Sequence, residues 1–128
     1  AAVADYTPVQ PANEKIKKTE KELRVELTKT TDILKTLGGR KTNKQVLVGF
    51  ALETNNEEEY ALQKLQTKNA DMIVLNSLQD AGAGFGHDTN KITIFDKTGK
   101  AYPFGVKSKK EVARDIVNTI IQQFYAKN

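Results

Sequence analysis

Six segments have the spacing of apolar residues that predicts β-strands: residues 1–6, 23–28, 46–52, 72–75, 91–95 and 101–106. The second segment alternates apolar and polar side chains, which predicts a strand with one buried face. The third and fourth are unbroken apolar runs, typical of strands covered on both faces. The last two predict a hairpin around a polar turn. Prolines after the first segment predict no regular structure as far as residue 12.

Three segments predict helices: residues 30–37, 57–69 and 108–124. The first is expected to end at the Gly38-Gly39 pair. Asn56 is expected to cap the second helix, since three glutamates follow it and favour the positive helix end. Ser108 and Glu111 predict a capping box at the start of the third. The apolar face expected on that helix is formed by Val112, Ala113, Ile116, Val117, Ile120, Ile121 and Phe124.

Strands that alternate with helices predict an α/β fold with a largely parallel sheet and an antiparallel edge. The length of 128 residues fits one domain that covers residues 1–128. The chain starts at alanine rather than methionine, so residues are expected to have been lost in front of it.

The composition narrows the possible functions. The chain has no cysteine and a single histidine, which excludes disulfides, thiolate metal sites and cysteine nucleophiles. No apolar run approaches the roughly 20 residues that cross a bilayer. These absences fit a cytoplasmic protein with no membrane partner. The formal net charge of +4 is interleaved with acids and favours an anionic ligand only mildly.

Two groups of lysines are candidates for phosphate binding. Lys15, Lys17 and Lys18 follow a strand and a proline-containing loop, where ammonium groups could clamp a triphosphate. The alternative is a solvated basic stretch, since glutamates surround it. Lys64 and Lys68 share one helix face beyond a strand end, where ligands of open α/β sheets gather. Ordinary surface lysines are the alternative for this pair.

Other candidate functional residues have weaker support from the sequence. Residues 82–86 are glycine-rich but match neither a dinucleotide fingerprint nor a P-loop. His87 and Asp88 could act as an acid–base pair, but no nucleophile accompanies them. Asp5 ends a predicted strand and could hold a metal ion or a ligand hydroxyl. Phe50 is most simply a core residue, although it could stack on a base if the neighbouring glycine opens the strand end.

Several short motifs are each common in proteins, but their order along this chain is specific enough to indicate a family. They are AAVADY at 1–6, EKIKK at 14–18, VGFALET at 48–54, KL with a further lysine at 64–68, DMIVLN at 71–76 and GFG with Asp88 and Asn90. This order resembles the C-terminal two-thirds of bacterial phosphopantothenoylcysteine synthetase, also called phosphopantothenate–cysteine ligase. In many bacteria that enzyme is the second half of a bifunctional coenzyme A biosynthesis flavoprotein. The resemblance implies a Rossmann-like, ribokinase-like fold.

The resemblance implies a CTP-dependent ligation of 4′-phosphopantothenate with cysteine, through an acyl-cytidylate, with Mg²⁺ as cofactor. Lys15 falls at the position of the family's essential lysine, and Lys17 and Lys18 would support the phosphate charge. Asp5 would act through the ribose or Mg²⁺. Some relatives use ATP instead of CTP. The residues that match nucleotide-binding positions are Ala1, Asp5, Lys15, Thr31, Asp32, Ile33, Leu34, Phe50, Lys64 and Lys68.

The resemblance also implies what this sequence lacks. The family's glycine-rich phosphate loop and an asparagine that stabilises the acyl-cytidylate belong to its N-terminal part, which has no match here. We therefore expect missing N-terminal βα units and a chain that is catalytically incomplete by itself. The family is dimeric, and residues 22–30 are expected to form a dimerisation arm. The alternative functions are a structural or dimerisation module without catalysis and, less favoured because acids interleave with the basic residues, nucleic-acid binding.

Overall fold

The structure is a computed structural model that describes residues 3–18, 21–77 and 88–126. Contacts between residues divide the chain into two compact units, Ala1–Ile33 and Leu34–Asn128. None of the helices in these described ranges is long and apolar enough to cross a membrane.

The first unit is built around a short antiparallel ribbon. Strand β1 (Tyr6–Pro8) pairs with β2 (Leu27–Lys29), with Thr7 opposite Thr28. Past one end of the ribbon, Thr30 N–H donates to the Asp5 carbonyl at 2.9 Å. Pro8 lies inside β1, so the predicted absence of structure there is wrong. A two-stranded ribbon has outer edges on which a proline's missing N–H costs no ladder hydrogen bond.

The apolar residues of this first unit are largely uncovered. Only the end of the alternating segment 23–28 forms a strand, and every residue of β1 and β2 is exposed. Among the described residues of this unit, eight large apolar side chains are more than half exposed: Val3, Tyr6, Val9, Ile16, Leu23, Val25, Leu27 and Ile33. Within the described residues, the predictions of a buried strand at 1–6 and of a buried face along 23–28 are therefore wrong. Alternation showed which side chains share a face but not what covers that face.

The second unit contains a four-stranded sheet in the order β3-β4-β6-β7. Strands β3 (Val48–Glu53) and β4 (Met72–Ser77) are parallel. Strands β6 (Ile92–Asp96) and β7 (Ala101–Pro103) add two antiparallel pairings and form the predicted hairpin. The α/β class is confirmed, and the sheet is mixed, with one parallel and two antiparallel pairs among the described strands.

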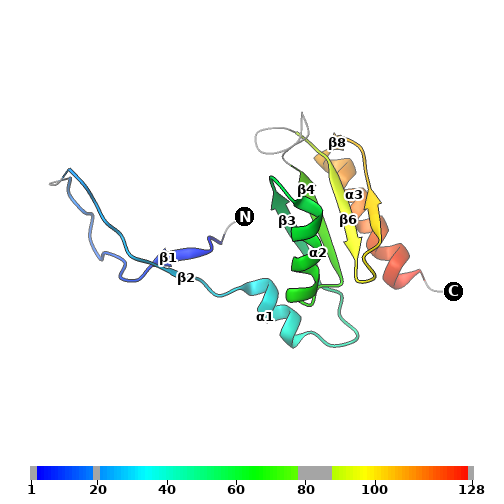
Figure 1. Cartoon of the computed structure of the whole chain (residues 1–128), viewed down its shortest axis with the longest axis horizontal. Helices are drawn as coiled ribbons and strands as arrows, with labels where there is room; N and C mark the ends of the chain where they lie inside the picture. The colour runs from blue at the N-terminus through cyan, green and yellow to red at the C-terminus, as the bar shows by residue number, and fades with distance from the viewer. Residues whose placement is uncertain (1–2, 19–20, 78–87, 127–128) are drawn as a thin grey trace. The chain divides into compact units, whose positions relative to one another are not determined.

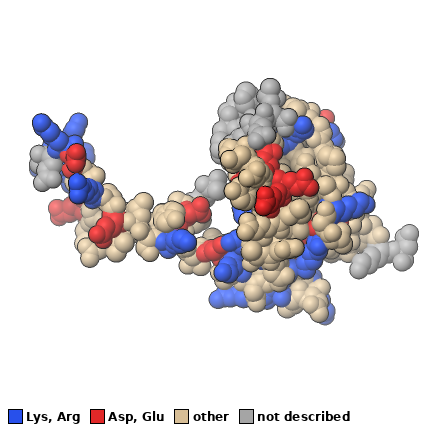
Figure 2. Space-filling model, in the orientation of Figure 1, with Lys and Arg blue, Asp and Glu red and all other residues tan. Residues whose placement is uncertain are grey.

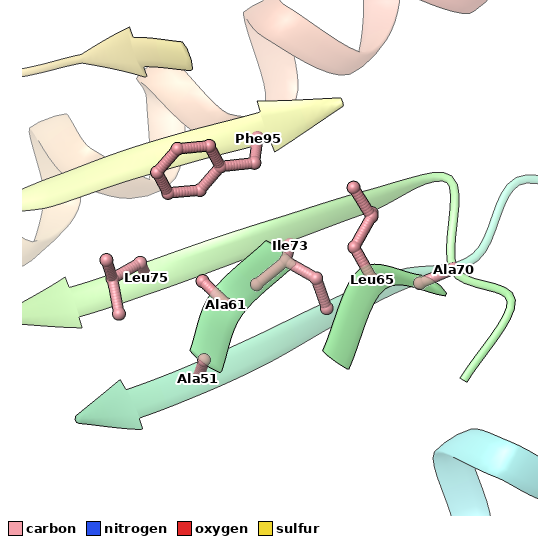
Figure 3. Close-up of a cluster of buried hydrophobic side chains, with 7 residues drawn as sticks. All are labelled: Ala51, Ala61, Leu65, Ala70, Ile73, Leu75 and Phe95. Carbon is pink, nitrogen blue, oxygen red and sulfur yellow. The ribbon is translucent and has the colours of Figure 1, made fainter. Parts of the chain in front are cut away.

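Helix α2 (Glu57–Thr67) covers one face of this sheet (Figure 1). Its side chains Ala61 and Leu65 pack with Ile73, Phe95 and other residues of the sheet in the cluster drawn in Figure 3. The predicted helix and its acidic first turn are confirmed, and acidic side chains gather near its start in Figure 2. Asn56 is the N-cap residue, as predicted, but its backbone is left-handed (φ 46°) and its side chain makes no capping hydrogen bond.

Helix α3 (Lys109–Ile120) covers the opposite face, over a second cluster that includes Met72, Val74 and Ile94. The capping box is confirmed, since Ser108 and Glu111 exchange both hydrogen bonds. One π-helical turn, η1 (Ile121–Tyr125), continues the helix. Ahead of α3, β5 (Thr89–Asn90) pairs with β8 (Lys107–Ser108).

The apolar face of α3 is narrower than the sequence predicted. Val112 is buried, and Ile116, Ile120 and Phe124 pack beside it at a spacing of four residues. The next positions around the helix, Ala113, Val117 and Ile121, are exposed. A helix covers a sheet with one stripe, and the seven expected residues span a wider arc than that stripe.

Helix α1 (Ile33–Arg40) runs through the Gly38-Gly39 pair, so the predicted end at these glycines is wrong. Gly38 instead permits a close approach, since a Cβ there would lie 1.8 Å from the Lys68 carbonyl oxygen. The Asn69 side chain donates to the Gly38 carbonyl at 2.8 Å, which fixes the end of α2 to α1.

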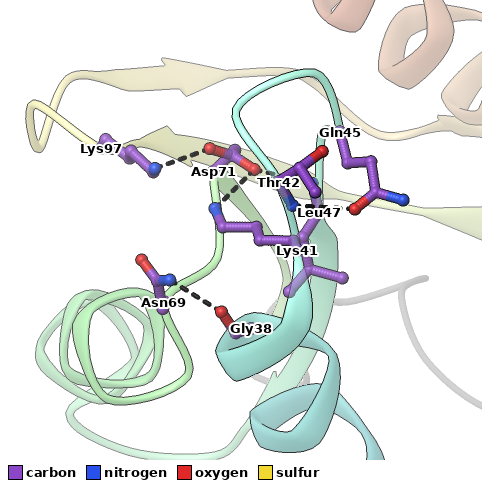
Figure 4. A network of polar contacts seen from close by, with 8 residues as sticks. All are labelled: Gly38, Lys41, Thr42, Gln45, Leu47, Asn69, Asp71 and Lys97. Atoms are coloured by element: carbon purple, nitrogen blue, oxygen red, sulfur yellow. Dashed lines mark hydrogen bonds and ion pairs between the residues drawn. The ribbon is translucent and has the colours of Figure 1, made fainter.

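A charged network lies at the start of β4 (Figure 4). One carboxylate oxygen of Asp71 accepts from Lys41 Nζ at 2.8 Å and from the Leu47 N–H at 2.7 Å, and the other contacts Lys97 Nζ at 2.8 Å. Burial alone would raise the pKa of Asp71, but these hydrogen bonds together hold that pKa below its usual range. The contact with Asp71 raises the pKa of Lys97. Asp71 thus joins the α1–β3 loop to the β6–β7 turn.

Candidate functional site

An open depression of about 330 Å³ lies between α2 and the end of β3. Its lining consists of Glu53, Tyr60, Gln63, Lys64, Thr67 and Lys68. The structure therefore brings Lys64 and Lys68 to one concave surface, as their spacing predicted. Two ammonium groups against one carboxylate leave a modest positive charge, which suits an anionic ligand.

Lys64 connects this depression to Phe50. Its Nζ donates to the Phe50 backbone carbonyl at 3.2 Å. In the described sheet β3 has a neighbour on one side only, so this lysine covers part of an open strand edge, a common protection against unwanted pairing. The same contact places a cation beside the Phe50 backbone.

Phe50 itself is an exposed aromatic residue. Its side chain is 59% exposed, and Leu52, on the same face of β3, is 42% exposed. The prediction that β3 is covered on both faces is therefore wrong, because β3 lies at the sheet edge, where the α3 side is incompletely covered. An exposed aromatic ring at this place can stack on a planar ligand.

Gly49 does not open the strand end to a ligand, as the sequence suggested it could. A Cβ at Gly49 would lie 2.7 Å from Leu34 Cδ2 and 2.9 Å from Ile73 Cδ1. The space beside this glycine is therefore filled by core side chains. The exposure of Phe50 comes from the edge position of β3 instead.

Asn76 is a candidate residue that the sequence analysis missed. It lies near the carboxyl end of β4, opposite Leu52 in the parallel pairing, and is part-buried. Its side-chain oxygen Oδ1 is buried and has no hydrogen-bond partner in the described part of the chain. A buried acceptor without a donor is uncommon in folded proteins and calls for an explanation. The sequence did contain a sign of this residue, because Asn76 directly follows the apolar run of β4. The carboxyl ends of such strands form the sheet edge at which ligands gather.

The first unit holds the other predicted lysines. Lys15, Lys17 and Lys18 are exposed and lie outside regular structure. Asp5 is exposed too, and its backbone carbonyl accepts from Thr30. Ala1 lies outside the described residues, as do the glycine-rich segment 82–86 and His87.

The predicted nucleotide-bordering segment leads into α1. Thr31, Asp32 and Ile33 are exposed. Leu34 is part-buried, and its side chain packs against the cluster beneath α2. The side chain of Leu34 therefore serves the core rather than a ligand site.

A resident metal site does not fit the described residues. They contain no group of three or more His, Asp or Glu side chains placed to hold an ion. Mg²⁺ commonly binds through one or two carboxylates together with the phosphates of a nucleotide, a binding mode that needs no such group.

Residues 1–124 match the family model described as DNA/pantothenate metabolism flavoprotein C-terminal domain. A cysteine/cysteine sulfinic acid decarboxylase from an unknown prokaryotic organism is 53% identical over 121 residues, 94% of this chain and 34% of that protein. The coenzyme A biosynthesis bifunctional protein CoaBC of Bacillus subtilis is 48% identical over 120 residues, 94% of this chain and 29% of that protein. This chain thus spans about a third of the length of these relatives.

Solved structures are similar as well, among them two that cover nearly the whole of this chain. The C-terminal domain of a coenzyme A biosynthesis bifunctional protein CoaBC is 42% identical, with a TM-score of 0.71, over 99% of this chain and 53% of that one. The DNA/pantothenate metabolism flavoprotein from Streptococcus pneumoniae is 22% identical, with a TM-score of 0.68, over 97% of this chain and 61% of that one, which supports the fold alone.

Proposed function

Because this chain belongs to the DNA/pantothenate metabolism flavoprotein C-terminal domain family, whose members here include CoaBC proteins of coenzyme A biosynthesis, we propose that it binds the nucleotide of a CTP-dependent ligase. The ligase joins 4′-phosphopantothenate to cysteine. The observation that carries the proposal is the convergence of Lys64 and Lys68 on one depression, with Lys64 bonded to the backbone of an exposed Phe50.

The proposed reaction has two steps. A carboxylate oxygen of 4′-phosphopantothenate attacks the α-phosphorus of CTP, and the bond to the β-phosphate oxygen breaks, which releases pyrophosphate. The cysteine amine then attacks the acyl carbon, loses a proton and displaces CMP. Negative charge grows on phosphate oxygens in the first step, so fixed cations beside them stabilise the transition state.

Each proposed site residue has a separate role in binding the nucleotide or stabilising charge. Lys64 and Lys68 hold the phosphates along the edge of β3, and Phe50 stacks on the base. Lys15 offsets the charge that grows on the phosphoryl oxygens or aids the attack of the cysteine amine, with Lys17 and Lys18 as charge support. Asp5 meets a ribose hydroxyl or the Mg²⁺ that the phosphates carry. The reaction belongs in the cytoplasm, where nucleotide triphosphates and Mg²⁺ are supplied.

Catalysis needs more than these 128 residues. The chain covers 53% of the solved CoaBC C-terminal domain, and β3 exposes both its edge and two apolar side chains. We expect the remaining half of such a domain to complete the sheet and to supply the groups that act on the acyl-cytidylate, whereas the residues proposed to bind the nucleotide belong to this chain. The decarboxylase name of one relative belongs to a protein of which this chain matches a third.

A second copy of the chain is the proposed partner of the first unit. Residues 22–30 belong to a ribbon with exposed apolar side chains, and an isolated two-stranded ribbon is at best marginally stable in water. Exposed apolar surface of this kind commonly marks an interface. The alternative function, a dimerisation module without catalysis, shares this arm but gives the depression at α2 no role.

The proposed reaction is tested on a longer relative such as the Bacillus subtilis protein. Replacing the lysine that matches Lys15 by Gln is expected to lower pyrophosphate release from CTP, 4′-phosphopantothenate and cysteine by about 100-fold or more, within the range for loss of one transition-state charge contact. The matched control replaces the residue at the position that corresponds to Lys110, which in this chain is exposed on α3. Normal turnover without the first lysine would refute its role.

A further inference from the structure

The unpaired oxygen of Asn76 and the ring of Phe50 belong to the same face of the sheet. In β4, Met72 and Val74 belong to the cluster beneath α3, and Asn76 continues that alternation. In β3, Val48 packs on the same cluster, so Phe50 and Leu52 point to that side as well.

The register places the two side chains close together. Asn76 lies opposite Leu52, which is two residues beyond Phe50. One strand spacing and two residues of rise give about 8 Å between the Phe50 and Asn76 positions. A planar ring stacked on Phe50 that extends toward β4 therefore brings its edge to the Asn76 amide.

The backbone holds Asn76 in place while its amide can turn. Asn76 is paired with Leu52 on one side and Ile92 on the other, so its Cα is fixed in the sheet. The terminal torsion of an asparagine is broad, and the residue is only part-buried, so rotation presents Oδ1 at the surface. A ligand that donates a hydrogen bond then satisfies an acceptor that has no partner among residues 3–18, 21–77 and 88–126.

We propose that Asn76 reads the base of the bound nucleotide, through a hydrogen bond from the exocyclic amine of cytosine to Oδ1 while the base stacks on Phe50. This inference rests on the proposed nucleotide binding and adds a base-recognition residue to it. An amide carries an acceptor and two donors, which matches the amine and ring nitrogen at the edge of cytosine. Lys64 lies on the α2 side of the sheet and bonds to the Phe50 carbonyl at the open edge of β3, so the proposed ligand passes over that edge, with its base on the α3 side and its phosphates at the depression.

The test separates base contacts from phosphate contacts by titration calorimetry with CTP and with inorganic tripolyphosphate. Asn76→Leu keeps the side-chain size and removes the amide. We expect it to weaken CTP binding about three- to tenfold and to leave tripolyphosphate binding within twofold of the unsubstituted chain. Lys64→Gln is the matched variant and is expected to weaken both ligands.

Thermal unfolding distinguishes a ligand-binding role from a structural one. Replacing an unpaired buried acceptor by an apolar side chain removes a desolvation penalty, so Asn76→Leu is expected to unfold at the same or a higher temperature. Asn76→Ala, which cannot overfill the site, should show the same selective loss of CTP binding.

Each result has a distinct meaning. Unchanged CTP affinity in both Asn76 variants, or an equal loss for CTP and tripolyphosphate, overturns the assignment of Asn76 while nucleotide binding stands. A chain that binds neither ligand before any substitution refutes the proposed function itself, and the base contact falls with it.

Discussion

Asp71 and Lys41 form an ion pair, with 2.8 Å between Oδ2 and Nζ, and their side chains are only 10% and 11% exposed. The same carboxylate contacts Lys97, whose side chain is 53% exposed. One acid therefore has a nearly buried cation on one side and a solvated cation on the other. Because desolvated charges depend on their partners and solvated ones do not, the two contacts should differ in their effect on stability.

Substitution of Asp71 by Leu is expected to lower the free energy of unfolding by about 3 kcal/mol, since Lys41 and the Leu47 N–H lose their acceptor. Substitution of Lys97 by Met should cost about 1 kcal/mol or less. Urea unfolding of both variants measures the difference. Equal losses would show that burial does not distinguish the two contacts.

The same pair predicts a pH dependence. The folded-state pKa of Asp71 is lowered, so its stabilisation is present above the ordinary carboxyl range and is lost as pH falls below about 4. The difference in unfolding free energy between the unsubstituted chain and Asp71→Leu should be largest near neutral pH and shrink toward pH 3. A difference that grows on acidification would contradict the ionised pair.

Two glycines offer a matched comparison of packing. Gly49→Ala places a methyl group 2.7 Å from Leu34 Cδ2 and should cost about 1–3 kcal/mol of stability. Gly39→Ala meets nothing within 4 Å and lies inside α1, so it should stabilise the chain by up to about 1 kcal/mol. Thermal unfolding of both variants should show a lower unfolding temperature for Gly49→Ala and a higher one for Gly39→Ala. A neutral Gly49→Ala would mean that Leu34 does not fill that space.

The structure also clarifies what the sequence could and could not predict. Regular apolar spacing located α2, β4 and the hairpin of β6 and β7, because those elements bury a continuous face. Exposure of Phe50 escaped prediction, since it depends on the position of β3 at an edge of the sheet, which strand order decides. The Gly38-Gly39 pair suggested a helix end, but Gly38 serves the close approach of Lys68.

The candidate site was partly predictable for the same reason. Helical spacing alone placed Lys64 and Lys68 on one surface, and the structure confirms it. Asn76 was missed because an unpaired acceptor becomes visible only when its surroundings are known. The roles of Lys15 and Asp5 stay predictions from the family resemblance.

The exposed apolar residues of the first unit predict association. Replacing Leu23, Val25 and Leu27 by Ser should convert a dimer into a monomer in sedimentation velocity, because each side chain is more than half exposed and available to a second copy. The matched control, Val117→Ser, changes an exposed apolar residue on α3 and should leave the dimer intact. A monomeric unsubstituted chain at all concentrations would contradict the proposed arm.

The most direct test of nucleotide binding is the affinity of this chain for CTP with Mg²⁺, measured by titration calorimetry at two salt concentrations. The double variant Lys64→Gln/Lys68→Gln is expected to lose about tenfold or more in affinity and part of the salt dependence, since it removes both ammonium groups of the depression. The control Lys44→Gln/Lys110→Gln removes the same charge from exposed positions elsewhere and should bind as the unsubstituted chain does. Equal affinities in all three proteins would contradict a nucleotide site at α2.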